Sequence, residues 1–187
     1  MEGNLVLILG GARSGKSRFA QEMAARLSDR VLFVATAEPG DPEMRARIEA
    51  HRRERPATWR VLEAPLDVGR CLAGALEGVE VVVLDCLTLL VANVFTAGQD
   101  PVSGGGDCLP GAVRRVREEI EAFLEVVRGH PLHFLVVANE VGLGIVPENP
   151  LARYYRDALG MANQMLAREA GEVILMVAGI PVWIKKP

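Results

Sequence analysis

The fold is decided by the stretch Leu5-Val6-Leu7-Ile8-Leu9-Gly10-Gly11-Ala12-Arg13-Ser14-Gly15-Lys16-Ser17. Its apolar run, residues 5–9, predicts a buried strand, and a helical pattern follows over residues 16–27. Between them, residues 10–17 match G-x-x-x-x-G-K-[S/T] in the strand-to-helix position that this motif requires. The stretch therefore predicts a phosphate-binding loop (P-loop) in an α/β fold.

The predicted P-loop would hold phosphate groups through its backbone and two side chains. Glycines let backbone N–H groups turn inward around a phosphate, and the helix start adds positive potential. Lys16 is expected to reach the β and γ phosphates, and Ser17 to ligate Mg²⁺. The ordinary alternative is a strand-to-helix turn without a ligand. The predicted nucleotide-binding residues here are Gly10, Gly11, Ala12, Arg13, Ser14, Gly15, Lys16 and Ser17.

Strand and helix patterns alternate along the rest of the chain. Strands are expected at residues 30–35, 59–62, 79–84, 133–138 and 173–178. Helices are expected at 42–55, 66–76, 112–128 and 150–170, with a helix or turn at 88–95. Such alternation predicts a mostly parallel sheet with helices on both faces, as in RecA-like P-loop proteins, and residues 182–184 would add a short antiparallel edge strand. Residues 97–111, rich in glycine, are expected to form a surface loop or insertion.

Composition limits the protein to a few classes. The 187 residues, 50% of them hydrophobic, are expected to form one domain, 1–187. A net charge of -3 and a pI near 5.7 argue against a nucleic-acid partner. The longest apolar stretch, 79–95, contains Asp85 and is shorter than the roughly 20 residues of a membrane span. Three cysteines without C-x-x-C spacing indicate reduced thiols and a cytoplasmic location.

Asp85 is the candidate acidic residue of the phosphate site. Four apolar residues, 81–84, precede it, which places its carboxylate at the carboxyl end of a strand, where α/β proteins bind ligands. Beside a P-loop, such an aspartate is expected to hold Mg²⁺, directly or through water. The alternative is a helix cap.

His51 lies among arginines in the helix that begins at Pro42. Guanidinium groups at this density suit a polyphosphate, although a solvated basic face is the plainer explanation. Neighbouring positive charges lower the pKa of a histidine and keep its imidazole neutral, the form that attacks phosphorus. Spacing alone leaves His51 either in the core or in a nucleophilic role. His130 and His133 look structural.

Several blocks of the sequence resemble the bifunctional adenosylcobinamide kinase and adenosylcobinamide-phosphate guanylyltransferase family. The resemblance spans nearly the whole chain, and the P-loop alone would not be specific to this family. The blocks are Gly10 to Arg18, Ala35-Thr36-Ala37, Glu43-Met44, Arg47-Ile48, His51-Arg52 through Arg55-Pro56, Trp59-Arg60, Asp85-Cys86-Leu87-Thr88, Asn139-Glu140-Val141-Gly142, Gly144-Ile145-Val146-Pro147 and Ala178-Gly179-Ile180-Pro181.

The resemblance implies two reactions at one P-loop. Adenosylcobinamide is phosphorylated with ATP or GTP, and GMP then passes from GTP to that phosphate through a GMP-histidine intermediate at His51. It also implies a homotrimer, and a catalytic role for Lys16 beside His51. The further nucleotide-binding residues that it implies are Ala35, Thr36, Ala37, Arg52, Arg53, Glu54, Arg55, Glu63 and Asp85, with Ser17 and Asp85 at the Mg²⁺ site.

Two alternative functions fit the residues without the resemblance. A RecA-like ATPase also carries a P-loop, an acidic residue after a strand, and alternating elements. A small-molecule kinase in which His51 is structural needs only the P-loop. Asn139 and Glu140 are candidate substrate contacts or a turn-forming pair, and residues 97–111 are a candidate lid over a large corrinoid.

Overall fold

The fold is a seven-stranded sheet in the order β3-β2-β4-β5-β1-β6-β7, in which only β7 runs antiparallel to its neighbour. The computed structural model describes residues 4–38, 40, 42–97 and 108–186. Within these, the side chains of Glu43, Met44, Arg47, Ala50, His51, Glu54 and Cys108 lie outside the described part. The strands are β1 (Leu5–Gly10), β2 (Val31–Ala35), β3 (Arg60–Glu63), β4 (Val81–Asp85), β5 (His133–Asn139), β6 (Glu172–Val177) and β7 (Ile180–Lys185).

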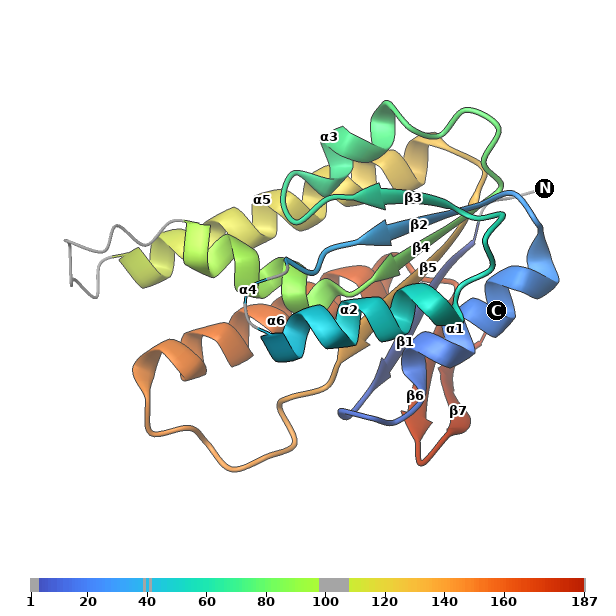
Figure 1. Ribbon diagram of the computed structural model, residues 1–187. Coiled ribbons are helices and arrows are strands. Elements are labelled where there is room, and N and C mark those ends of the chain that lie inside the picture. Colours follow the sequence, from blue (N-terminus) through green and yellow to red (C-terminus); the bar gives the residue numbers. More distant parts are fainter. Residues whose placement is uncertain (1–3, 39, 41, 98–107, 187) are drawn as a thin grey trace.

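Helices cover both faces of this sheet, as the alternating pattern predicts (Figure 1). Helices α1 and α2 lie on one face, and α3, α4, α5 and α6 lie on the other. The helices are α1 (Lys16–Leu27), α2 (Pro42–Glu54), α3 (Val68–Ala73), α4 (Leu87–Ala97), α5 (Cys108–Gly129) and α6 (Pro150–Glu169). The expected α/β P-loop architecture and the antiparallel edge strand are therefore confirmed.

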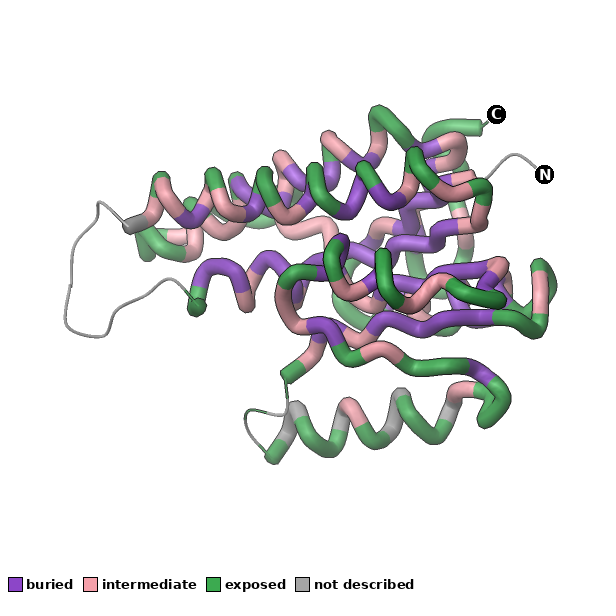
Figure 2. The backbone as a smooth tube through the Cα atoms, turned by 90° about the horizontal axis from the view of Figure 1, so that it is seen from above, coloured by how far each residue is buried: buried purple, intermediate pink, exposed green. Residues whose placement is uncertain are grey.

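The buried residues form two layers, one on each side of the sheet. Side chains alternate along a strand, so Leu5 and Leu7 of β1 point into the larger layer, while Val6 and Ile8 point into the smaller one beneath α1. Figure 2 shows the buried segments concentrated in the strands, with exposure greatest on the outer turns of the helices. Strands buried on both faces explain why the sequence shows continuous apolar runs.

Two segments differ from the sequence-based expectation. Helix α5 begins at Cys108, so residues 108–111, expected to be loop, are helical. The pattern at 88–95, expected as helix or turn, is the helix α4, and it continues to Ala97. Pro110 lies within the first turn of α5, where the missing N–H of proline removes no intrahelical bond. The rest of the expected loop, 98–107, lies outside the described residues.

Gly69 of α3 lies directly against the backbone of α5. A methyl group at this position would lie 2.6 Å from the backbone carbon and oxygen of Ala122. Backbone atoms cannot rotate away from such a contact, so the ordinary helix-forming advantage of alanine, up to about 1 kcal/mol, is outweighed. We expect Gly69→Ala to lower the free energy of unfolding by about 1–3 kcal/mol in urea denaturation.

Gly74 provides the matched control for this prediction. It ends α3 at φ -91°, and a methyl group there meets no atom within 4 Å. Gly74→Ala is therefore expected to leave the unfolding midpoint nearly unchanged. Equal midpoints for the two variants would show that α3 and α5 do not pack this closely in solution.

Candidate active site

The P-loop follows β1 directly and holds two glycines that other residues could not replace. Gly10 has φ +151°, and a Cβ there would lie 2.6 Å from the carbonyl oxygen of Met176 and 2.7 Å from Ser14 Oγ. Gly15 stands before α1 with φ +93°, in the left-handed region that side chains with a Cβ disfavour. These backbone positions turn the chain from β1 into the start of α1.

Lys16 is buried against the loop that precedes it, with 7% of its surface exposed. Its ammonium donates to the carbonyl oxygen of Gly11 at 2.5 Å and to Ser14 Oγ at 3.3 Å. The charge therefore lies over the loop where the β and γ phosphates of a nucleotide would bind. Arg13, in contrast, is exposed and adopts φ +57°.

The P-loop also rests on the turn between β6 and β7. The N–H of Gly179 donates to the carbonyl oxygen of Ser14 at 3.0 Å. Both turn residues, Ala178 and Gly179, have positive φ, 50° and 82°. A turn more than 160 residues away in the sequence thus supports the middle of the loop; its sequence block was part of the family resemblance, but this contact was not predicted.

Asp85 and two other predicted residues meet at the carboxyl edge of the sheet. Ala35 of β2 is aligned with Asp85 of β4 on one side and with Glu63 of β3 on the other. Strand β5 separates β4 from β1, so Asp85 and Gly10 end strands that are one strand apart. The structure thereby brings three predicted nucleotide-binding residues onto the edge that also carries the P-loop.

Thr36 joins two of these strand ends and is fully buried. Its hydroxyl donates to the carbonyl oxygen of Cys86 at 2.8 Å and accepts from the Cys86 N–H at 2.9 Å. The Asn93 amide of α4 donates to the carbonyl oxygens of Thr36 and Pro65, at 2.8 and 3.0 Å. Asn93 therefore ties together the segments that follow β2 and β3, a role that no sequence pattern indicated.

Removing the Thr36 hydroxyl is expected to destabilise this edge. Thr36→Val leaves the Cys86 N–H without that partner, while the Cys86 carbonyl oxygen still accepts from the Leu90 N–H at 3.2 Å, and a buried unsatisfied polar group costs about 1–3 kcal/mol. We expect a matching loss in the free energy of unfolding, measured by urea denaturation. Thr36→Ser keeps the hydroxyl and should recover most of that loss; a serine variant as unstable as the valine variant would contradict the prediction.

Cys86 does not qualify as a nucleophile despite its place beside Asp85. Burial, and secondarily the negative charge of Asp85, raise the pKa of its thiol to about 11. At neutral pH the thiol is therefore protonated and unreactive. Cys86 instead packs against the smaller buried layer.

Helix α2 and the segment after it bring two arginines to the same edge. Arg52 forms ion pairs with Glu49 and Glu63, each at 3.3 Å. The Arg55 guanidinium lies 4.3 Å from the ring centroid of Phe33. Burial and the charge of Arg52 lower the pKa of Arg55, whereas the nearby carboxylates of Asp85 and Glu63 raise it.

Three further residues of α2 were predicted for the nucleotide site: Arg53, His51 and Glu54. Arg53 is exposed, and the side chains of His51 and Glu54 lie outside the described part. The backbone places His51 in the last turn of α2, directly before Arg52. The two roles considered for His51, packing in the core and nucleophilic attack, therefore stay predictions. Ala37 is half-buried just beyond Thr36.

Asn139 and Glu140 form a structural turn next to the P-loop. The N–H of Glu140 donates to the carbonyl oxygen of Gly10 at 3.1 Å, and its carboxylate accepts from the Gly142 N–H at 2.6 Å. Asn139 donates its N–H to Thr88 Oγ1 at 2.7 Å. Of the two roles considered for this pair, these contacts favour the turn.

Ser17 and Asp85 supply oxygen atoms of the kind that Mg²⁺ prefers. Ser17 lies in the first turn of α1, and α1 packs against β4, which ends at Asp85. Among the described residues, no three histidine, cysteine, aspartate or glutamate side chains cluster in a way that could hold a metal by themselves. The donor set fits a Mg²⁺ ion that takes its remaining ligands from phosphate and water.

The chain is similar to known proteins over almost its full length. The profile of the family described as "Cobinamide kinase / cobinamide phosphate guanyltransferase" matches residues 6–184. "Bifunctional adenosylcobalamin biosynthesis protein CobU" of Escherichia coli is 40% identical over 184 residues, 97% of this chain and 99% of that protein. The protein CobP of the same description from Pseudomonas aeruginosa is 41% identical over 179 residues, 96% of each.

A solved structure, the crystal structure of the RadB recombinase, has a TM-score of 0.48 and 17% identity, and the match covers 93% of this chain and 74% of that one. In the part of the chain that the structure describes, helices are too short or too polar to cross a bilayer.

The profile match and two relatives at about 40% identity agree with the residues gathered around the P-loop. The chain therefore belongs to the cobinamide kinase / cobinamide phosphate guanyltransferase family of enzymes.

Proposed function

We propose that this enzyme phosphorylates adenosylcobinamide and then transfers GMP from GTP to the new phosphate through a GMP adduct of His51. One observation carries the transfer step: the helix that holds His51 also brings Arg52 to Glu63, at the sheet edge where Asp85 and the P-loop lie. The name of the relatives, which includes adenosylcobalamin biosynthesis, supports the adenosylated substrate.

In the first half of guanylyl transfer, the P-loop backbone and Lys16 hold the β and γ phosphates of GTP. A neutral imidazole nitrogen of His51 attacks the α phosphorus, and the bond from that phosphorus to the β-phosphate oxygen breaks. Pyrophosphate leaves from the P-loop with the negative charge that Lys16 offsets. Arg52 and Arg55 supply positive charge near the same edge.

In the second half, a phosphate oxygen of the phosphorylated acceptor attacks the α phosphorus. The phosphorus–nitrogen bond breaks, His51 becomes free, and the diphosphate linkage of adenosylcobinamide-GDP forms. In the kinase reaction, the acceptor hydroxyl instead attacks the γ phosphorus of ATP or GTP, the bond from that phosphorus to the β-phosphate oxygen breaks, and the nucleoside diphosphate and the hydroxyl proton are released. Mg²⁺ bound by Ser17 and Asp85 would neutralise phosphate charge in both reactions.

Labelling with GTP tests the adduct directly. The purified protein is incubated with Mg²⁺ and GTP labelled at either the α or the γ phosphate, and is then denatured and analysed by electrophoresis and mass spectrometry. We expect an acid-labile label from α-labelled GTP only, on the peptide that contains His51. An unlabelled protein, or an adduct mapped to another residue, would contradict the proposed intermediate.

We further propose that residues 1–187 form one domain and assemble as a homotrimer in the cytoplasm. A single sheet that contains all seven strands, from β3 at one edge to β7 at the other, supports one domain. The edge strand β7 exposes Ile180, Val182 and Ile184, with 66%, 48% and 61% of their surfaces accessible, and apolar edge strands favour association. Light scattering that gave the mass of a monomer would contradict the trimer.

A further inference from the structure

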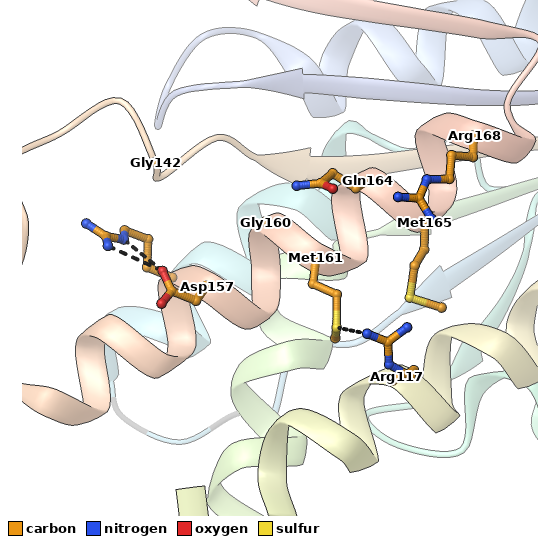
Figure 3. A pocket seen from close by; sticks show the side chains of 9 residues that line it. Arg117, Gly142, Asp157, Gly160, Met161, Gln164, Met165 and Arg168 are labelled. Carbon is orange, nitrogen blue, oxygen red and sulfur yellow. Dashed lines mark hydrogen bonds and ion pairs between the residues drawn. The ribbon is translucent and has the colours of Figure 1, made fainter. Parts of the chain in front are cut away.

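A hollow of about 400 Å³ lies along α6 (Figure 3). It is lined by Arg117 of α5, by residues of α6, and by Gly142 in the segment after β5. Its volume is within the range of small-molecule pockets, but it is too small to enclose a macrocycle. Of its lining, only Gly142 belongs to a sequence block quoted for the family resemblance, and none of the residues proposed for nucleotide binding lines it.

The lining of this hollow is rich in hydrogen-bond donors. Arg156 is paired with Asp157 at 3.3 Å. Arg117 donates to the sulfur of Met161 at 3.1 Å, a weak acceptor, and Figure 3 shows these two side chains pointing toward one another. Within the described residues, neither Arg117 nor Arg168 forms an ion pair. The hollow therefore presents two guanidinium groups to a ligand with oxygen acceptors.

The hollow also has apolar surface and an apolar neighbour. The thioether side chains of Met161 and Met165 form part of its wall. The segment that continues from Gly142 exposes Leu143 and Ile145, with 87% and 97% of their surfaces accessible. Exposed apolar groups beside donor groups fit a ligand that combines an apolar body with polar substituents.

The hollow begins close to the P-loop. Gly142 lies two residues after Glu140. The N–H of Glu140 donates to the carbonyl oxygen of Gly10, the first residue of the P-loop, at 3.1 Å. Two residues of extended chain span at most about 7 Å, so Gly142, at the edge of the hollow, lies within about this distance of the Glu140 backbone that is bonded to the P-loop. A corrinoid is wider than this separation, and its apolar macrocycle carries carboxamide groups around its rim.

We infer that the hollow between α5 and α6 is the subsite for the rim of the corrinoid acceptor, with its guanidinium groups donating to carboxamide oxygens. This inference rests on the proposed function, because that function supplies the corrinoid. The reacting end of the acceptor extends from the rim toward the P-loop, past Glu140 and Gly142. The arginines of the hollow thus hold the acceptor without taking part in phosphoryl transfer.

Equilibrium dialysis of cobinamide without nucleotide tests the subsite. The test variants are Arg117→Gln and Arg168→Gln, and the control is Arg114→Gln, also in α5, whose side chain is 76% exposed and paired with Glu118 at 3.8 Å. We expect Arg117→Gln and Arg168→Gln each to weaken cobinamide binding about tenfold or more, and Arg114→Gln to bind as the unmodified protein does. All variants should form the GMP adduct from GTP equally, which also verifies their folding.

Two results would overturn the subsite. Equal affinity of all four proteins for cobinamide is one of them. The other is binding of inorganic pyrophosphate that Arg117→Gln and Arg168→Gln weaken while cobinamide binding is unchanged, because the hollow would then serve a free anion. Failure of the unmodified protein to form a GMP adduct would count against the proposed intermediate and not against the subsite.

Discussion

His51→Ala is expected to abolish guanylyl transfer while leaving phosphorylation of adenosylcobinamide measurable. Without the imidazole, GMP has no covalent carrier, and loss of a nucleophile lowers turnover by several orders of magnitude, about 10⁴-fold or more. Phosphorylation needs the P-loop and not His51, because the acceptor hydroxyl attacks the γ phosphorus directly. Separate assays of phosphorylated corrinoid and of corrinoid-GDP measure the two reactions.

His130→Ala is the matched control for this prediction. His130 lies in the connection between α5 and β5, at the opposite end of the sheet from the P-loop. Its Nδ1 lies 2.9 Å from the carbonyl oxygen of Val126. This variant should keep both activities. If His51→Ala transferred GMP as fast as His130→Ala, His51 would not be the carrier, and if it also lost phosphorylation, the histidine would serve nucleotide binding in general.

Lys16→Ala is expected to reduce both reactions by about 10²–10³-fold or more, the usual effect of removing a group that stabilises transition-state charge. Lys16 is the buried cation of the P-loop, held at the Gly11 carbonyl oxygen. Both reactions develop negative charge on β and γ phosphate oxygens, so one loss should affect both. Rates of corrinoid phosphorylation and of GMP adduct formation measure this effect.

Arg18→Ala controls for the removal of a positive charge from the same helix. Its side chain is 84% exposed and pairs with Glu22 at 2.8 Å, one turn further along α1. We expect this variant to keep both activities and the same unfolding temperature. Selective loss of one reaction in Lys16→Ala would mean that the two reactions use different phosphate sites.

The sequence was sufficient for much of the fold because its signals are local. The apolar runs, the P-loop and the Asn149-Pro150 helix start each lie within a few residues, and α6 begins at Pro150 with Asn149 as its cap. The predicted start of α5, at residue 112, was wrong. The glycines and prolines in 97–111 are typical of a loop, yet the helix already begins at Cys108. Local composition there indicated loop, but packing of the whole helix determines its first turn.

The family blocks also located the P-loop and the strand-end residues, and alignment of Ala35 with Asp85 and Glu63 brings these together. The contacts of Asn93 were not predictable, because it bonds to residues 57 and 28 positions away. The hollow along α6 was also missed, since its arginines come from two helices with no shared motif. Such features depend on how elements pack, which periodicity does not describe.

The turn at Gly179 supports the P-loop but is synthesised near the end of translation. The P-loop is among the first segments to be synthesised, but β1 pairs with β5 and β6, and Ser14 receives its hydrogen bond from Gly179. At roughly 5–20 residues per second, a ribosome reaches Gly179 roughly 8 to 30 seconds after the P-loop. Nascent chains therefore carry a complete P-loop sequence for many seconds before the strands and the turn that hold the loop in place have been synthesised.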